Sequence, residues 1–560
     1  MLDVIARSQR GRVCEYKRSE STVVTPFVMT TTRGTSDDPV FISVDGRGRT
    51  LHVMGTEVFI DADLLTSESS DISVDPKFEK GVSVLRLPIT GDDKIVGDTE
   101  IVVIANAFEL RKDARRLVST IIRLRESVGY NVLICAPGLA DPSNMALLTY
   151  MGVDIFDDSV SFVSGKRGIN TIPEGGIVTG DDVSSQNVEE MHRECEKIRD
   201  FIRGGRLREL VDQRAASSSF SVAVLRIFDR VGYEYQEEAC STVGCRFACN
   251  TTQSLRRPEI LRYRERMMEE YRRPEHKRIL LLLPCSAKKP YHTSKTHKRF
   301  ASAIHTADHD TIVHEVIVTS PLGLVPRELD VFFPASSYDI PVTGEWKCQE
   351  KEMIREMLAH FIEMGYEKVI SHLGEDTELI AGLTDVTETC VGDVTSPASL
   401  TKLDETLREV TKGMKFGDYM VDRKETVRSL LGYQFGNRIA DAIMDEDTFA
   451  TGKFPYWKIM RGKTQLGMLT AERGMVSLTM EGAEILYECG TYTVEMGDFD
   501  LAGNLFAVGV VDADPSIRIG DEVAVVCDGK VKGVGVAAMS GREMKELRRG
   551  IAVKIRHKAR

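Results

Sequence analysis

A group of reactive side chains follows a strongly apolar segment near the middle of the chain. Residues 279–284 read ILLLLP, and Cys285 comes directly after them. Cations and acid–base groups follow closely, and they are Lys288, Lys289, Tyr291, Lys295 and His297. A thiol near lysines or at a helix N-terminus has a lowered pKa, so more of it is the nucleophilic thiolate. This spacing predicts a reactive site, whereas the alternative is a buried, inert cysteine followed by solvent-exposed lysines.

Alternating strands and helices must position these groups. Apolar runs bounded by turn residues predict buried strands, and amphipathic spacing predicts the helices between them. The strands are expected at 278–284, 311–320 and 366–374, and the helices at 294–307 and 345–365. This order implies a parallel sheet, which presents the carboxyl ends of its strands to a ligand crevice. We therefore expect Cys285 at that edge. Ser294 and His297 lie one helical turn apart if a helix has begun there, and His297 is a candidate general acid or base.

The rest of the chain predicts further domains. Residues before about 270 alternate expected strands, such as 100–108 and 131–138, with helices such as 111–129, which implies an α/β layer or barrel. A helix at 424–444 then precedes short strands. The C-terminal part reads as short strands, with Asp528-Gly529 as a strong two-residue hairpin signal. That last pattern predicts a small β-barrel.

Composition is that of an ordinary globular protein. Of the 560 residues, 42% are hydrophobic and 28% are charged. No segment approaches the ~18 apolar residues that span a bilayer, and charges interrupt the N-terminus too early for a signal peptide. The eleven cysteines are scattered, which favours reduced thiols. We therefore expect a soluble, cytoplasmic protein with no membrane partner.

Positive charge is concentrated in two segments of an acidic chain. The formal net charge is -12, yet residues 251–300 contain fourteen Lys or Arg and five Asp or Glu, and residues 541–560 contain eight and two. Two basic segments on an acidic body fit a protein that contacts phosphates at chosen places. The alternative is that these are ordinary solvated helix faces.

One motif in the central stretch resembles a known family. Its pattern is Pro-Cys, three residues, Lys-Pro-Tyr, two residues, Ser, two residues, His, and it is formed by Pro284, Cys285, Lys289, Pro290, Tyr291, Ser294 and His297. This pattern resembles that of the archaeosine synthases, archaeal tRNA-modifying relatives of tRNA-guanine transglycosylase. The segments VTSPLGLVPRELD, YDIPVTGEW and CNTTQSLRRPEILRYRERM look like the same family. The segment LICAPGLADPSNMALLTYMGVDIFDD is similar to the transglycosylase barrel, and the C-terminal residues resemble a PUA domain.

The resemblance implies a fold and a reaction. The fold is a multidomain α/β protein with a transglycosylase-like (β/α) barrel at 1–272, a central α/β catalytic domain at 273–405, a small α+β domain at 406–485 and a PUA RNA-binding β-barrel at 486–560. The family adds a nitrogen donor to the nitrile of 7-cyano-7-deazaguanine in the D-arm of tRNA. The donor is free lysine in some members, whose adduct a radical SAM partner cleaves, and glutamine or ammonia in others. Relatives suggest a homodimer, and no cofactor is implied with certainty.

The resemblance also assigns roles to residues. The catalytic set is Cys285, Lys289, Tyr291, Ser294 and His297. The substrate-binding set is Lys288, Ser320, Arg327, Glu328 and Asp339. The RNA-binding set is Arg548, Arg549, Lys554 and Arg556.

The residue types fit nitrile chemistry. Freeing a lysine amine at pH 7 costs about 4.6 kcal/mol, whereas ionising an ordinary thiol costs about 2 kcal/mol. We therefore hypothesise that Cys285 attacks the nitrile and that the donor amine displaces it. His297 or Tyr291 would protonate the nitrile nitrogen, and Lys289 would bind an anion or tune the thiol. Direct addition of the amine, with Cys285 only lining the pocket, is the alternative.

Other functions compete with this assignment. Asp157 matches the position of the transglycosylase nucleophile, but the following residues SVSFVSGKRG differ from the Pro-Thr-Arg context of the active enzymes. Cys240, Cys245 and Cys249 could bind zinc with His276, although their spacing is irregular. A non-catalytic PUA-type RNA-binding protein and a thiol amidohydrolase that does not use RNA remain as further alternatives.

Overall fold

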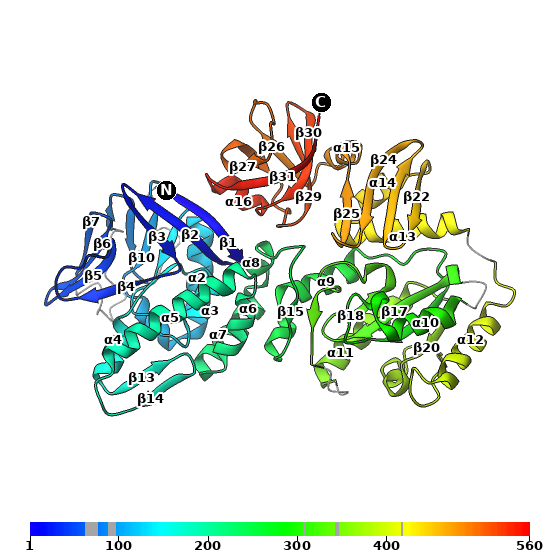
Figure 1. Ribbon diagram of the computed structural model, residues 1–560, viewed down its shortest axis with the longest axis horizontal. Coiled ribbons are helices and arrows are strands. Elements are labelled where there is room, and N and C mark those ends of the chain that lie inside the picture. The colour runs from blue at the N-terminus through cyan, green and yellow to red at the C-terminus, as the bar shows by residue number, and fades with distance from the viewer. Residues whose placement is uncertain (62–76, 88–96, 306–309, 342–345, 416–417, 560) are drawn as a thin grey trace. The chain divides into compact units, whose positions relative to one another are not determined.

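The computed structural model describes residues 1–61, 77–87, 97–305, 310–341, 346–415 and 418–559. These residues form two compact units (Figure 1). Unit 1 comprises Met1–Cys240, Leu505–Val510 and Met539–Ala552, and unit 2 comprises Ser241–Asn504, Val511–Ala538 and Val553–Arg560. The main segment of unit 1 thus ends before the boundary predicted at residue 272. Two segments of the predicted 486–560 domain also belong to unit 1, and the other predicted boundaries stay predictions.

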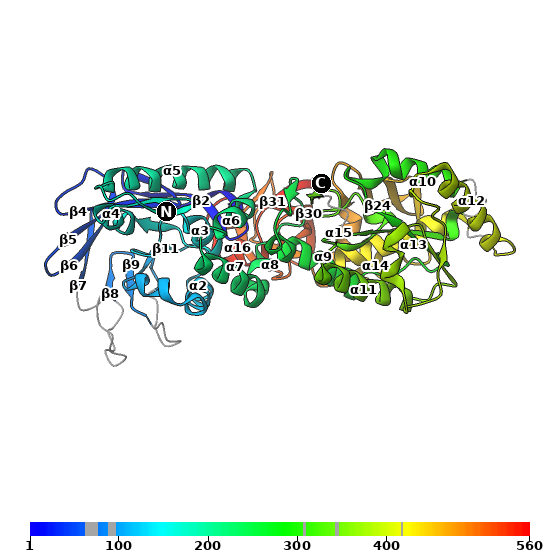
Figure 2. The ribbon, with the colours of Figure 1, turned by 90° about the horizontal axis from the view of Figure 1, so that it is seen from below.

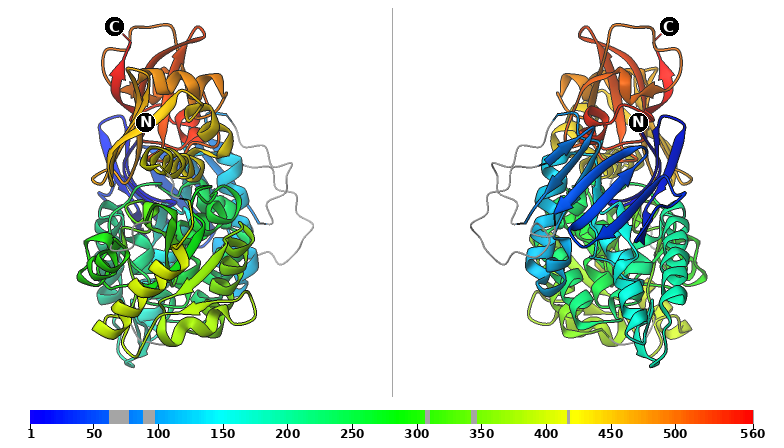
Figure 3. Two further views of the ribbon diagram at one scale, coloured as in Figure 1. Left: turned by 90° about the vertical axis from the view of Figure 1, so that its right-hand side faces the viewer. Right: turned by 90° about the vertical axis from the view of Figure 1, so that its left-hand side faces the viewer.

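Unit 1 is built around a nine-stranded mixed sheet with the order β7-β6-β5-β4-β12-β11-β10-β9-β8 (Figure 3). The strands are β4 (Phe27–Thr32), β5 (Val40–Asp45), β6 (Gly48–Val53), β7 (Thr56–Asp61), β8 (Lys77–Glu79), β9 (Val82–Leu85), β10 (Ile101–Ile104), β11 (Leu133–Cys135) and β12 (Ile155–Asp157). Neighbours from β9 through to β5 are parallel, whereas β5-β6-β7 and β8-β9 pair antiparallel. A smaller antiparallel sheet contains β1 (Leu2–Ser8), β2 (Gly11–Arg18) and β3 (Ser21–Thr25).

Three helices of unit 1 follow its parallel strands β10, β11 and β12, and they are α2 (Ala114–Val128), α3 (Met145–Met151) and α4 (Ser159–Lys166). The hairpin β13 (Ile169–Ile172) and β14 (Gly175–Val178) comes after α4. The other described α-helices of unit 1 are α5 (Ser184–Arg203), α6 (Leu207–Ala215), α7 (Ser219–Val231), α8 (Tyr233–Glu238) and α16 (Gly541–Glu546). The expected strands 100–108 and 131–138 and the helix 111–129 are confirmed as β10, β11 and α2. The sheet pairs parallel in its middle and antiparallel at both ends. The α/β character is therefore confirmed, and the transglycosylase-like barrel layout stays a prediction.

The central sheet of unit 2 has the order β18-β17-β16-β20-β21. Its strands are β16 (Ile279–Pro284), β17 (Val313–Thr319), β18 (Gly323–Pro326), β20 (Lys368–Ser371) and β21 (Thr387–Glu388). All pairs are parallel except β17-β18. The helices are α9 (Pro258–Glu269), α10 (Lys295–His305), α11 (Cys348–Glu363) and α12 (Pro397–Thr411). The three strands and two helices expected for this region are all present.

The apolar run before Cys285 is buried on both faces, as expected of a central parallel strand. Ile279, Leu281 and Leu283 share a core with residues of α10 and α12, namely Phe300, Ile304, Leu403 and Leu407. Leu280 and Leu282 point to the other face because side chains alternate along a strand, and they are equally buried. This packing fixes β16, so the residue that follows it has a defined position.

A second antiparallel sheet in unit 2 contains β22 (Thr448–Lys453), β23 (Tyr456–Arg461), β24 (Thr464–Thr470) and β25 (Met475–Leu478). It accompanies α13 (Tyr419–Phe435), α14 (Asn437–Ile443) and α15 (Met480–Glu488). The single helix predicted at 424–444 is wrong, because α13 ends at Gly436, whose φ of 92° is incompatible with a continuous helix.

The C-terminal strands of unit 2 are β26 (Thr493–Met496), β29 (Glu522–Cys527), β30 (Lys530–Ala537) and β31 (Ile551–Lys558), in the order β31-β30-β29-β26. β28 (Val510–Ala513) pairs at the edge of this sheet. The hairpin predicted at Asp528-Gly529 is confirmed. Both residues have positive φ, at 49° and 71°, as a type I′ turn requires.

Candidate functional site

Cys285 lies at the carboxyl end of β16, in a partly exposed position. The parallel neighbour β17 ends beside it, because Pro284 pairs with Val318 and Thr319 is the last residue of β17. The sequence therefore correctly predicts that the thiol lies at the edge where parallel strands end. Cys285 is partly exposed, whereas the residues from Ile279 to Leu283 of β16 are buried.

The pKa of the Cys285 thiol is raised above its ordinary value. Burial is the main cause, and the carboxylate of Asp376 adds to it. A hydrogen bond with the Thr319 hydroxyl and the charge of Lys289 act in the opposite direction. The sequence predicts a lowered pKa from the nearby lysines, and this is wrong because desolvation outweighs the one cation that lies close. The resting thiol is therefore protonated and needs a base before it can attack.

A network of buried hydroxyl groups surrounds the thiol. Tyr291 is fully buried, and its hydroxyl is hydrogen-bonded to that of Tyr338 and lies 3.3 Å from Oγ1 of Thr319. The Tyr338 hydroxyl lies 2.6 Å from the same Oγ1. Burial raises the pKa of both phenols, so they stay protonated and can act as hydrogen-bond donors. Thr319 thus joins the thiol to two neutral phenols.

Lys289 completes this cluster. Its ammonium nitrogen lies 4.1 Å from the ring centroid of Tyr338, which is a favourable cation–π distance. Burial lowers the pKa of Lys289, while the charges of Cys285 and Asp339 partly oppose that shift. A lysine with a lowered pKa exchanges its proton more readily near neutral pH, so it can serve as an acid and a base.

His297 does not fit the predicted role of proton donor. Its imidazole is buried, and its Nδ1 accepts a hydrogen bond from Nη2 of Arg327 at 2.8 Å. Burial and the Arg327 charge lower the pKa of His297 to about 2. The ring is therefore neutral at pH 7. It packs against the ring of Tyr291 at a centroid distance of 5.2 Å, so it helps to fix the position of that tyrosine.

Ser294 also has a structural contact that the sequence does not reveal. Its side chain is buried and its Oγ accepts the backbone N–H of His297 at 3.1 Å. Because α10 begins at Lys295, this contact is a helix N-cap. Lys288, predicted to bind substrate, is exposed on the loop after Cys285.

The other residues predicted to bind substrate divide into two groups. Asp339 affects the pKa of Lys289 and forms an ion pair with Arg246 at 2.7 Å, so it belongs to the cluster around the thiol. Ser320 follows Thr319 and donates a hydrogen bond to Glu350.

The second group lies in internal ion pairs and hydrogen bonds. Arg327 contacts Glu315 at 2.8 Å and the buried Asp330 at 3.4 Å. Glu328 is buried and accepts a hydrogen bond from the Tyr271 hydroxyl at 2.6 Å, with His314 beside it at 3.4 Å. Tyr271 and His314 lie outside the thiol cluster, so these contacts do not bring Glu328 to the site.

The sequence reasoning misses three residues of the cluster, Thr319, Tyr338 and Asp376. Thr319 has a recognisable signal, since it ends the strand next to β16 and strand ends meet at one edge of a parallel sheet. Tyr338 and Asp376 lie on a short strand and a 3-10 helix, β19 (Tyr338–Asp339) and η6 (Gly374–Ile380), and no periodicity predicts where these point.

Three family models match this chain. A domain of unknown function, DUF5591, covers residues 260–407 and therefore includes the thiol cluster up to Asp376. The patch-forming domain C2 of tRNA-guanine transglycosylase matches residues 425–492, and the PUA domain matches residues 499–559.

Relatives extend the similarity along most of the chain. Archaeosine synthase subunit alpha of Thermoplasma acidophilum is 32% identical, covering 93% of this chain and 98% of the relative. Archaeosine synthase subunit alpha of Methanosarcina acetivorans is 33% identical, covering 82% of this chain and 80% of the relative. Archaeosine synthase of Haloferax volcanii is 30% identical, with 84% of each chain covered. This chain belongs to the archaeosine synthase family.

The PUA domain predicted for the C-terminal part of this archaeosine synthase family member is confirmed at residues 499–559. In this member, Arg548, Arg549 and Lys554 are exposed. Arg556 instead pairs with the fully buried Glu522 and donates to the carbonyl of Leu478 at 2.9 Å. The guanidinium of Arg556 is thus engaged within unit 2. The RNA roles of all four residues stay predictions.

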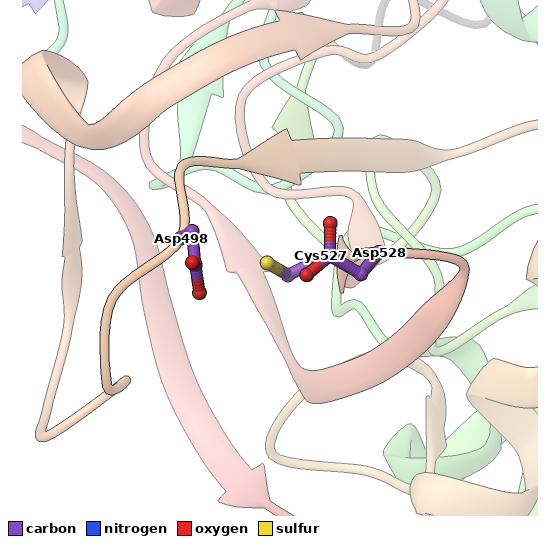
Figure 4. A group of neighbouring side chains, drawn as sticks. All are labelled: Asp498, Cys527 and Asp528. Atoms are coloured by element: carbon purple, nitrogen blue, oxygen red, sulfur yellow. The ribbon is translucent and has the colours of Figure 1, made fainter.

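The cysteines considered as an alternative zinc site are not assembled among the residues that the structure describes. Among the described residues, one group of three potential ligands has its atoms within 4.8 Å of one another, and it consists of Asp498, Cys527 and Asp528 (Figure 4). Cys240, Cys245 and Cys249 do not form such a group, and Nε2 of His276 instead contacts Asp422 at 2.5 Å. The Cys527 thiol donates to the carbonyl of Gly497 at 3.6 Å, and both aspartates are exposed. A protonated thiol between two exposed carboxylates is a weak basis for a metal site.

Asp157, the candidate transglycosylase nucleophile, is buried at the end of β12. Its Oδ1 accepts the backbone N–H of Gly138 at 2.6 Å, and its Oδ2 has no hydrogen-bond partner among the described residues. None of the described helices is both long enough and apolar enough to cross a membrane.

Proposed function

We propose that this protein adds an amine donor to the nitrile of 7-cyano-7-deazaguanine in the D-arm of tRNA, giving an amidine on the way to archaeosine. The observation that carries the proposal is the cluster at the end of β16, where a thiol, a lysine of lowered pKa and a protonated phenol pair meet. Membership of the archaeosine synthase family supports the reaction, and the PUA domain supports tRNA as the substrate. Free lysine is the donor that we favour, and glutamine or ammonia is the alternative.

The first step is attack by the thiol. Lys289, as the neutral amine, removes the proton of Cys285, and the resulting thiolate adds to the nitrile carbon. One C–S bond forms and one bond of the nitrile triple bond breaks, so its electron pair moves to nitrogen. Lys289, now an ammonium, gives its proton to that nitrogen. The product is a thioimidate, and no oxidant, reductant or metal is required.

The second step releases the enzyme. The donor amine adds to the thioimidate carbon and loses one proton, the C–S bond breaks, and the thiolate of Cys285 takes up a proton. The phenols of Tyr291 and Tyr338 remain protonated, so they are suited to hold the developing charge on nitrogen in both steps. The neutral ring of His297 positions Tyr291 through its packing. Arg327, which orients His297, therefore acts indirectly.

Remote contacts with tRNA should supply part of the catalytic effect. If binding of the tRNA body positions the nucleotide, the free base loses turnover as well as affinity. Exposed Arg548, Arg549 and Lys554 are candidates for this contact. A radical SAM partner that cleaves a lysine adduct and a homodimeric assembly are further parts of this proposal that follow from the family resemblance.

The test is mass spectrometry of nucleosides from tRNA that carries 7-cyano-7-deazaguanine, incubated with isotopically labelled lysine, glutamine or ammonium in turn. A mass gain equal to lysine names both donor and reaction. Cys285→Ala should abolish conversion but leave tRNA binding nearly unchanged, because the thiol contacts the nitrile and not the backbone. Cys348→Ala is the matched control, since Cys348 is an exposed thiol at the start of α11 in the same unit.

Two results would contradict the proposal. Rapid conversion of the free base, or label in tRNA that contains only guanine, would remove the assignment of substrate. Near-normal turnover by Cys285→Ser would eliminate the covalent route and leave direct addition of the amine. A covalent protein–tRNA adduct trapped with the wild type, and missing with Cys285→Ala, would support the covalent route.

A further inference from the structure

A groove of about 510 Å³ runs along the exposed side of α7 in unit 1. Three arginines line it, Arg115 from α2 together with Arg226 and Arg230 from α7. All three are exposed. Val222, Ala223 and Ile227 are half-buried and form its apolar floor. The two helices pack against each other, as both views of the ribbon show (Figures 1 and 2).

The arrangement follows from how each helix is built. Asp113 caps α2 by accepting the backbone N–H groups of Arg115 and Arg116, which fixes Arg115 in the first turn. Arg226 and Arg230 are four residues apart, so they share one face of α7. The opposite face of α7 is apolar, with Leu225 and Phe228 buried, so the arginines can only face outward.

The groove has little negative charge near it. α2 and α7 together contain six arginines and two carboxylates, in a chain whose net charge is -12. Asp229 is buried in an ion pair with Arg208 at 2.6 Å. Glu126 is eleven residues from Arg115, or roughly 16 Å along the helix axis.

Two carboxylates just before α2 are also engaged. Asp113 accepts two backbone N–H groups at 3.0 Å, and Glu109 faces Arg116 at 3.8 Å. Arg115 and Arg230 have no carboxylate partner among the residues that the structure describes.

We propose that this groove binds the phosphate backbone of tRNA, at a place outside the nucleotide that is modified. A guanidinium group binds phosphate through two parallel hydrogen bonds, and Arg115 and Arg230 present two such groups on one groove. The apolar floor suits a ribose or a base edge between them. The proposal rests on tRNA being the substrate, and it assigns a part of that binding to unit 1 rather than to the PUA domain alone.

The experiment compares two double variants of the full chain. Arg115→Gln/Arg230→Gln removes two charges from the groove. Arg193→Gln/Arg203→Gln removes two charges from α5 in the same unit, where both arginines are exposed and pair with acidic neighbours along the helix. Binding of an unmodified tRNA transcript is measured by fluorescence anisotropy from 50 to 300 mM salt, with thermal melting to confirm that each variant folds.

The groove variant should bind tRNA several-fold more weakly at low salt, and the slope of log K against log salt should become shallower by about 1.4–1.8. The α5 variant should keep the wild-type slope. Equal slopes of log K against log salt for the two variants would overturn the proposal. An acidic segment of a partner protein would then be the next candidate to test as the ligand of the groove. Because the transcript carries no nitrile, a shallower slope supports this inference even if the wild type fails to convert the modified nucleotide.

Discussion

Replacing Thr319 by valine isolates the part of the site that only the fold assembles. The substitution keeps the shape of the side chain and removes one hydroxyl. That hydroxyl hydrogen-bonds the Cys285 thiol and lies 2.6 Å from the hydroxyl of Tyr338. Because the bond with Thr319 lowers the pKa of the thiol, its loss should raise that pKa further.

The size of the effect follows from the bond that is lost. A hydrogen bond to a charged group contributes about 1.5–3 kcal/mol, and each ~1.4 kcal/mol is a tenfold change in an equilibrium. The variant should therefore hold roughly ten- to a hundredfold less thiolate at pH 7. Stability should fall by only about 1–2 kcal/mol, since the hydroxyls of Tyr291 and Tyr338 still bond to each other.

The assay is the rate at which iodoacetamide alkylates Cys285, followed by peptide mass spectrometry between pH 6 and 10. Peptide mapping is needed because Cys245 and Cys348 are exposed and react as well. The alkylation profile of the variant should move to higher pH than that of the wild type, and the two rates should converge where both thiols are ionised. The pH profile for conversion of modified tRNA should also move to higher pH in the variant.

The matched control is Thr411→Val, which removes a buried hydroxyl that donates to the carbonyl of Leu407 at 2.7 Å. It should cost similar stability and leave the alkylation profile of Cys285 unchanged. Superimposable profiles for wild type and Thr319→Val would refute the reasoning, because the hydroxyl would then have no influence on the thiol.

Two further substitutions test other parts of the structure. The pKa of His297 is about 2 in the folded protein and ~6.5 in the unfolded chain. Below about pH 6.5 the unfolded state therefore binds one more proton than the folded state. The free energy of unfolding then falls by up to about 1.4 kcal/mol for each pH unit that the pH is lowered. Urea denaturation at pH 7, 5.5 and 4.5 should show that the free energy of unfolding of His297→Asn falls less steeply with decreasing pH than that of the wild type. Equal falls for the two proteins would contradict the conclusion that His297 is buried and neutral. Asp157→Asn keeps an oxygen that can accept from Gly138, so nitrile conversion should stay within a few-fold of the wild type. Complete loss of conversion in a folded, tRNA-binding Asp157→Asn variant would place the chemistry in unit 1.

Much of the local structure could be predicted because it depends on local patterns. The strand 278–284 is continuous and apolar, and it becomes a central strand buried on both faces. Asp528-Gly529 has the two residues that best tolerate the backbone of a type I′ turn, and the hairpin forms there. The helix predicted at 424–444 was wrong at Gly436, because residues that favour a helix continue on both sides of a glycine whose backbone leaves the helix.

The sequence by itself determined which residues could react, since the order of Cys285, Lys289 and Tyr291 after an apolar strand is a property of the chain. Tertiary structure decided how they behave. Burial reversed the expected shift of the thiol pKa and made His297 neutral, because desolvation depends on surroundings that come from distant segments. Thr319 reaches Cys285 because β17 ends beside β16, and Tyr338 joins the cluster through its hydrogen bond with Thr319. The spacing of residues along the chain cannot show which side chains are buried next to one another. Burial and these neighbours set the protonation state of each side chain.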